Sequence, residues 1–133
     1  MALLERPSDV RRLPDASAAE ALFAGLAGEP VEVAAFAYLG TGQRLLGLRH
    51  TRPGRRDWLD LPIRDIAADA IAFDAAAVVM AHNHPSGDPS PSVADRQATR
   101  QLARALRALE VHLLDHLIVT ADRVVSFRAL GLL

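Results

Sequence analysis

The pattern of apolar and polar positions along the chain predicts an alternation of helices and strands. In some segments apolar residues recur at the helical period of 3.6, and in others they form short runs typical of strands. In chain order we predict helix 15–28, strands 31–39 and 44–50, helix 63–74, strand 75–82, helix 92–110, strand 111–120, and a last strand with a closing turn in 123–133. This order predicts an α/β (α+β) fold, a layered sandwich of helices around a mixed β-sheet.

The pattern of apolar and polar residues is clearest in two neighbouring segments. Residues 75–82 form a continuous apolar run, which is typical of a central strand buried on both faces. Residues 92–110 have one apolar face and another lined by arginine. The inward positions are expected to be Leu102, Ala105, Leu106 and Leu109, and the arginines are Arg96, Arg100, Arg104 and Arg107. The connection 85–91 is rich in Pro, Ser and Gly, so we expect a loop there.

The length and composition predict one compact domain. The chain has 133 residues, of which 50% are hydrophobic and 23% are charged, as in ordinary globular proteins. We expect residues 1–15 to form an N-terminal arm, either loose or with a short helix at 8–13, and residues 16–133 to form the domain. No signal peptide or membrane span is recognisable, so the expected location is the cytoplasm.

Two of the five histidines lie where the apolar run 75–82 ends. His82 and His84 are two positions apart, so on a strand both imidazoles point to the same side. Asp95 follows in the first turn of the helix that begins at Ser92. Two imidazoles and one carboxylate are three ligands for a Zn²⁺ ion, with the fourth position left to water, as in catalytic zinc sites. The same residues also fit a plain helix-capping signal beside two loop histidines.

The spacing His-x-His, seven residues, Ser, two residues, Asp resembles the JAMM motif of the JAB/MPN metalloproteases. More narrowly, the chain is similar to the C-terminal domain of the RadC family over about residues 30–133. The matching stretches are PIRDI at 62–66, AHNHPSGDPSPS at 81–92, LLDHLIV at 113–119 and SFRALGLL at 126–133. The resemblance implies a JAB/MPN (cytidine-deaminase-like) fold and identifies residues 16–133 as a free-standing domain of this type.

The resemblance also implies the roles of the site residues. Family members carry a Glu at the start of the first long strand, for which Glu29 and Glu32 are the candidates, and the family pattern selects Glu32. Glu32 is expected to act as general base on the zinc-bound water, and Ser92 to stabilise the oxyanion. The implied activity is hydrolysis of a peptide or isopeptide bond in a protein or peptide substrate. One Zn²⁺ would be held by His82, His84 and Asp95.

Several neighbouring residues have open interpretations. Asp115 or His116 would either orient a metal ligand or, as the simpler interpretation, be a satisfied polar residue at the edge of the sheet. Asn83 and the turn 86–88 are expected to shape the rim of the cleft. The metal itself could be manganese, iron or cobalt, because two histidines and one aspartate also bind these ions.

Other functions can be weighed on the same residues. A zinc deaminase requires cysteine ligands, and the chain has no cysteine. An HNH nuclease disperses its three residues along the chain, whereas here Asn83 would point away from both histidines. A role in DNA repair, through weak nucleic-acid contacts, would use the basic segment Arg49–Trp58 and the arginines of 92–110, although the net charge is −1. A pseudoenzyme is a third alternative, but the motif retains its ligands.

Overall fold

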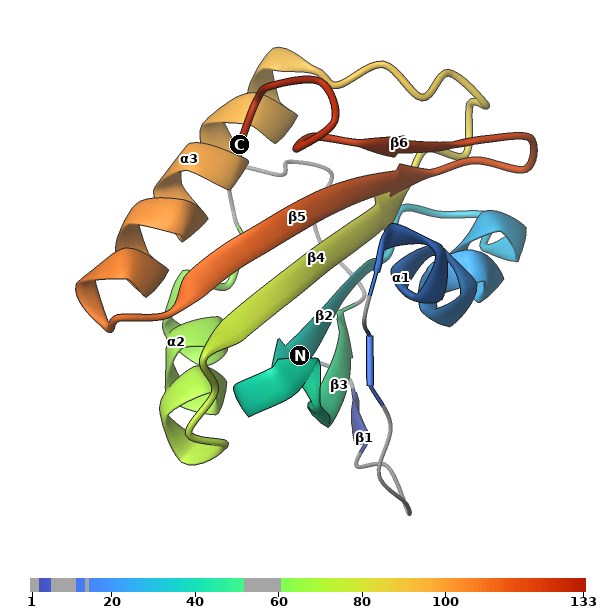
Figure 1. The fold of residues 1–133 in the computed structure, drawn as a ribbon. Coiled ribbons are helices and arrows are strands. Elements are labelled where there is room, and N and C mark those ends of the chain that lie inside the picture. Colours follow the sequence, from blue (N-terminus) through green and yellow to red (C-terminus); the bar gives the residue numbers. More distant parts are fainter. Residues whose placement is uncertain (1–2, 6–11, 14, 52–60) are drawn as a thin grey trace.

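The computed structural model describes residues 3–5, 12–13, 15–51 and 61–133, which form a six-stranded sheet with helices on both faces (Figure 1). The elements are β1 (Leu3–Glu5), α1 (Ala16–Phe23), η1 (Ala24–Gly28), β2 (Ala34–Leu39), η2 (Thr41–Gln43), β3 (Leu45–Thr51), α2 (Ile63–Ala72), β4 (Ala77–Asn83), α3 (Val93–Ala108), β5 (His112–Val119) and β6 (Val124–Ser126). The strand order is β1-β3-β2-β4-β5-β6. Among these strands β4 and β5 pair in parallel, and the other neighbours are antiparallel. The predicted layered fold with a mixed sheet is therefore confirmed.

The sheet separates two apolar cores. Successive side chains of a strand point to opposite faces, so β2 contributes to both cores. Leu39 packs with Phe23 of α1 on one face, whereas Phe36 packs with Ile66 of α2 and Leu102 of α3 on the other. Every residue of β2 and β4 is buried, as predicted for the central strand. A polar side chain on β4 must therefore find its partners inside the protein.

β2 is shorter than predicted. It starts at Ala34 rather than at residue 31, because the Val33 N–H donates to the Asn83 side chain at 2.7 Å instead of to a neighbouring strand. Within 123–133, β6 covers three residues and the predicted closing turn follows it. The chain turns after Ser126, whose carbonyl accepts from the Leu130 N–H at 3.1 Å.

The helices also differ from the prediction at their ends. The N-cap of α1 is Asp15, whose carboxylate accepts the Ala18 N–H at 2.9 Å. α1 ends at Phe23, and the 3₁₀ helix η1 continues to Gly28. Leu109 was expected to face inward but is 37% exposed, because α3 ends at Ala108. None of the helices in the described part of the chain has the length and apolar character needed to cross a bilayer.

The N-terminal arm is joined to the sheet at the positions that the structure describes. β1 pairs with β3, and Arg12 forms a bridge with Arg44. Leu13 is buried in the core beside α1. At these positions the arm is part of the fold rather than loose. Most of the short helix suggested at 8–13 lies outside the described residues.

A buried polar cluster connects α2 to the sheet. Asp69 of α2 accepts from the Tyr38 hydroxyl of β2 at 2.9 Å and from Arg49 Nη2 of β3 at 2.7 Å. Burial and the neighbouring carboxylate raise the pKa of Tyr38 above its usual range, so this hydroxyl remains a donor. The Arg49 guanidinium is therefore paired with Asp69 within the protein. Residues 52–58 of the basic segment expected to contact nucleic acid lie outside the described part of the chain.

Candidate metal centre

The two histidines and Asp95 meet at the carboxyl end of β4. His82 is on the face of β4 that packs against α2 and α3, like Val78 and Met80 before it. The loop after β4, yellow in Figure 1, leads directly into α3. Asp95 lies in the first turn of α3 and is 2% exposed. A strand end followed by a helix start is a common position for ligand sites in sheets with parallel strands, and here it carries three metal-binding side chains.

The ligand atoms are spaced as one small cation requires. His82 Nε2 lies 2.9 Å from His84 Nε2 and 3.3 Å from Asp95 Oδ1, and His84 Nε2 lies 3.1 Å from Asp95 Oδ2. A tetrahedral ion with ligands at about 2.0 Å separates neighbouring ligand atoms by about 3.3 Å. Two nitrogens and one oxygen suit zinc and other first-row divalent metals. The three side chains therefore fit a metal ion in both spacing and chemistry.

The negative charge of the buried Asp95 carboxylate also favours a cation at this point. Burial raises the pKa of Asp95, but the neighbouring imidazoles of His82 and His84 outweigh it and hold this pKa well below its usual range. The hydrogen bond with Asp95 raises the pKa of His84, against the effect of burial. A buried carboxylate is stable only beside a positive charge, which either a proton on an imidazole or a metal ion supplies. A metal ion bound at this point would take the place of that proton.

Glu32 faces the same point from the segment before β2. Its carboxylate and the imidazoles of His82 and His84 each offer a ligand atom, and these three atoms lie within 4.8 Å of one another. Glu32 is partly buried. Among the described residues this His-His-Glu group has the composition of a metal site, and it includes Glu32 rather than the alternative candidate Glu29.

Ser92 forms the N-cap of α3. Its hydroxyl accepts the Asp95 N–H at 2.9 Å, and its own N–H donates to Asp95 Oδ2 at 2.9 Å. This is a complete capping box, so the plain structural interpretation of Ser92 and Asp95 is correct. It does not compete with metal binding, because the capping bond uses one oxygen of Asp95 and leaves the other directed at His82.

Asn83 has a different role from the one expected at the rim of the cleft. The side chain is 1% exposed and lies on the opposite face of β4 from His82. Its Oδ1 accepts the Val33 N–H at 2.7 Å, and its Nδ2 donates to the carbonyls of Val31 at 2.9 Å and Glu29 at 3.2 Å. These three bonds hold the segment that carries Glu32. The residue between the histidines thus connects the general-base candidate to the metal ligands.

We expect Asn83→Ala to destabilise the protein by about 2–4 kcal/mol, because three backbone groups lose their partner. Asn83→Asp keeps the acceptor for Val33 but places an oxygen against two carbonyls, so it should be comparably damaging. Urea unfolding measures both changes. Gln101→Ala, at an exposed position of α3, is the control and should stay within about 0.5 kcal/mol of wild type. A wild-type stability of both Asn83 variants would contradict the assigned role.

Of the two interpretations left open for His116, the one that makes it a polar residue at the edge of the sheet is wrong. His116 is 0% exposed, and its Nε2 lies 2.6 Å from His82 Nδ1. Burial, and secondarily the neighbouring His82, lower its pKa well below the usual value. Asp115 points elsewhere and accepts from the Ser126 hydroxyl at 2.6 Å and the Arg128 N–H at 3.1 Å, which stabilises the turn after β6. Of the two, His116 contacts the candidate metal centre.

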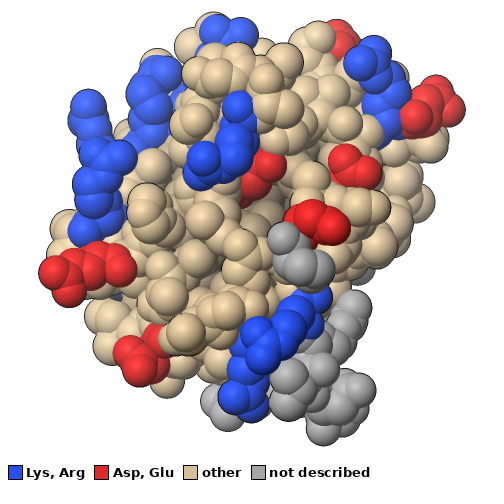
Figure 2. Space-filling model, viewed as in Figure 1, with Lys and Arg blue, Asp and Glu red and all other residues tan. Residues whose placement is uncertain are grey.

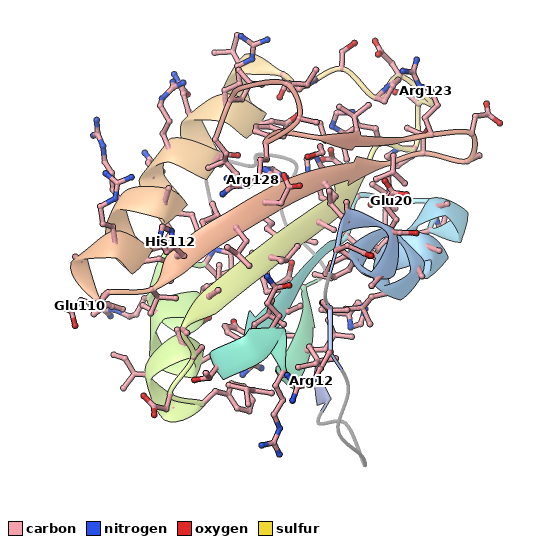
Figure 3. The ribbon with its side chains drawn as sticks, in the orientation of Figure 1. Arg12, Glu20, Glu110, His112, Arg123 and Arg128 are labelled. Carbon is pink, nitrogen blue, oxygen red and sulfur yellow. The ribbon has the colours of Figure 1, made fainter. Side chains whose placement is uncertain are left out.

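The remaining histidines and the arginine row lie apart from this contact. Figure 3 shows His112 at the start of β5 beside Glu110, at the opposite end of the strand from β6. His50 lies on β3. The four arginines of α3 are exposed, as predicted. On the face seen in Figure 2, basic side chains stand apart from one another and acidic ones are interspersed among them.

Comparisons with known proteins identify the family. The RadC-like JAB domain matches residues 13–132. A UPF0758 protein of Polaromonas sp. strain JS666 is 41% identical over 108 residues, which cover 81% of this chain and 48% of that relative. A UPF0758 protein of Bordetella avium is 34% identical over 130 residues, which cover 98% of this chain and 54% of that relative. The chain spans about half the length of these relatives. It belongs to the RadC-like JAB domain family.

Proposed function

We propose that this domain is a zinc-dependent hydrolase that cleaves a peptide or isopeptide bond. The observation that supports it most directly is the convergence of Glu32 with two imidazoles and the Asp95 carboxylate at one end of the sheet. When bound, zinc lowers the pKa of a water molecule and polarises a carbonyl group. The JAB domain superfamily is often hydrolytic, which agrees with this chemistry.

The distances favour different roles for Asp95 and Glu32. Asp95 oxygens lie 3.1 and 3.3 Å from the imidazole nitrogens, as expected for ligands of the same ion, so Asp95 completes the set with His82 and His84. The Glu32 carboxylate lies within 4.8 Å of the ligand nitrogens of His82 and His84, so it would be within reach of a water molecule held by an ion at this point. Glu32 takes a proton from this water as it attacks the carbonyl carbon. It then returns the proton to the leaving nitrogen.

Ser92 stabilises the oxyanion that forms on the substrate. A hydroxyl offers one hydrogen and two acceptor positions. Capping uses one acceptor position, for the Asp95 N–H, and the hydrogen remains for the substrate. Ser92 is exposed at the start of α3, where a substrate can reach it. Ser92 therefore caps α3 and also stabilises the oxyanion.

Removal of the metal tests the proposal. We expect the purified protein to contain about one zinc ion per chain by mass spectrometry. It should cleave members of a library of internally quenched peptides or a lysine isopeptide substrate. Dialysis against 1,10-phenanthroline should abolish cleavage, and one equivalent of ZnCl₂ should restore it. Cleavage that survives complete removal of the metal, or failure to bind any divalent metal, would contradict the proposal.

A further inference from the structure

We propose that His116 and Thr99 are positioning residues that hold His82 in the tautomer able to bind the metal. This inference rests on the proposed metal site and extends it to the side chains behind the ligands. His116 Nε2 lies 2.6 Å from His82 Nδ1, and His116 Nδ1 lies 2.6 Å from Thr99 Oγ1. The Thr99 hydroxyl lies 2.7 Å from the carbonyl oxygen of Asp95. Four groups are thus linked in one hydrogen-bonded series.

The direction of donation along the series follows from its last member. The Thr99 hydroxyl donates its single hydrogen to the Asp95 carbonyl one turn earlier in α3, as threonine often does within a helix. Thr99 Oγ1 then accepts from His116, which places a hydrogen on His116 Nδ1. In a neutral His116 ring, Nε2 carries a lone pair and accepts from His82 Nδ1. His82 therefore carries its hydrogen on Nδ1, and its Nε2 presents a lone pair toward His84 and Asp95.

The surroundings of His116 favour the neutral ring and restrict its rotation. His116 is 0% exposed and stacks on Phe127, with ring centroids 4.3 Å apart and planes inclined by 19°. Charging a ring that water cannot reach costs free energy, whereas both nitrogens of the neutral ring are already hydrogen-bonded. Thr99 is 1% exposed. Because both are enclosed, water cannot substitute for either partner.

In this tautomer the lone pair of His82 Nε2 is available to a metal ion before the ion binds. A histidine with its hydrogen on the ligating nitrogen has to move that hydrogen before a metal binds, and a second hydrogen bond sets the ring orientation. Here the hydrogen is on the opposite nitrogen. The contacts of His116 with His82 and with Thr99 also connect the ligand on β4 to the helix that carries Asp95. The site is therefore arranged before the metal arrives.

Nuclear magnetic resonance of the metal-free wild-type protein tests the proposal directly. Long-range ¹H–¹⁵N correlations distinguish the two tautomers of each imidazole ring. We expect His82 and His116 each to carry the hydrogen on Nδ1. The result that overturns the proposal is a hydrogen on Nε2 of His82, donated to Asp95, in the metal-free protein. This measurement requires no variant, no metal and no substrate.

Paired substitutions add a functional readout. Thr99→Val removes the acceptor for His116 Nδ1 at nearly constant volume, and Thr99→Ser retains it. We expect Thr99→Val to weaken zinc binding by about 10–100-fold and to shift His82 toward the Nε2–H tautomer, while Thr99→Ser stays close to wild type. His116→Phe keeps a flat ring against Phe127 but cannot accept from His82, so it should behave like Thr99→Val. His116→Gln keeps an acceptor and a donor and should recover most of the affinity.

Zinc affinity is measured by competition with a chromophoric chelator, and cobalt absorption spectra report the ligand geometry. Equal zinc affinities and equal cobalt spectra for Thr99→Val and Thr99→Ser would overturn the proposal. The proposed hydrolase activity and the positioning role of His116 and Thr99 can be tested separately. A wild-type protein that binds zinc but cleaves no substrate contradicts the proposed hydrolase, while the tautomers and affinities still decide the role of His116 and Thr99.

Discussion

Asp95→Ala is expected to lower the affinity for zinc by roughly 10²–10³-fold. Small zinc domains bind their ion with about 10–16 kcal/mol shared among four ligands, so one ligand accounts for about 3–4 kcal/mol. Asp95 is 2% exposed and lies within 3.3 Å of His82 Nε2, so water replaces it poorly. Chelator competition measures the Kd. The zinc-dependent rise in the unfolding temperature of the wild type should largely disappear in the variant.

Two further variants separate metal ligation from helix capping, because Asp95 takes part in both. Asp95→Asn keeps an acceptor for the Ser92 N–H but removes the negative charge, so it should also lose most of its zinc affinity. Ser92→Ala removes the capping hydroxyl and should cost about 1 kcal/mol of stability while retaining zinc. Wild-type zinc affinity in Asp95→Ala would show that this carboxylate is not a ligand.

Glu32→Gln is expected to reduce hydrolysis by about 10²–10⁴-fold and to leave zinc binding within a few-fold of wild type. The amide retains the size and hydrogen-bonding capacity of the side chain but cannot take the proton from water. Peptide cleavage under single-turnover conditions, with the metal content determined on the same sample, measures the two properties together. A loss of zinc in parallel with activity would instead make Glu32 a ligand.

Glu29→Gln is the matched control. It is the same chemical change three residues earlier, and Glu29 is not part of the His-His-Glu group. Its backbone carbonyl accepts from Asn83, a contact that a side-chain substitution leaves in place. Activity should therefore remain near the wild-type level. Equal losses in the Glu29 and Glu32 variants would point to a general disturbance of this segment rather than to a lost base.

The candidate metal ligands could be picked out from the sequence because their arrangement is local. His82 and His84 end a buried strand, and the helix carrying Asp95 starts within a dozen residues. Periodicity and turn chemistry are sufficient to bring such neighbours together. Glu32 was reached through the family resemblance, since no local pattern relates it to residues about fifty positions later.

Asn83 and His116 could not be understood in the same way, since each acts through a partner distant in the sequence. Asn83 bonds to backbone groups 50, 52 and 54 positions away, and His116 meets His82 across 34 positions. Alternation along β4 shows only that Asn83 faces away from His82. The pairing of β4 with β2 and β5 determines what it faces.

The sequence by itself determined the layered fold, the buried central strand, the helix cap at Ser92 and the spacing of a three-ligand metal motif. These properties depend on interactions between residues close in the chain, which periodicity and capping rules describe. The tertiary structure decided that Glu32 lies near the imidazoles, that Asn83 holds its segment and that His116 contacts His82. Sheet pairing and burial create these contacts, because a polar group enclosed in the core has to take whichever partner the neighbouring strand or segment presents.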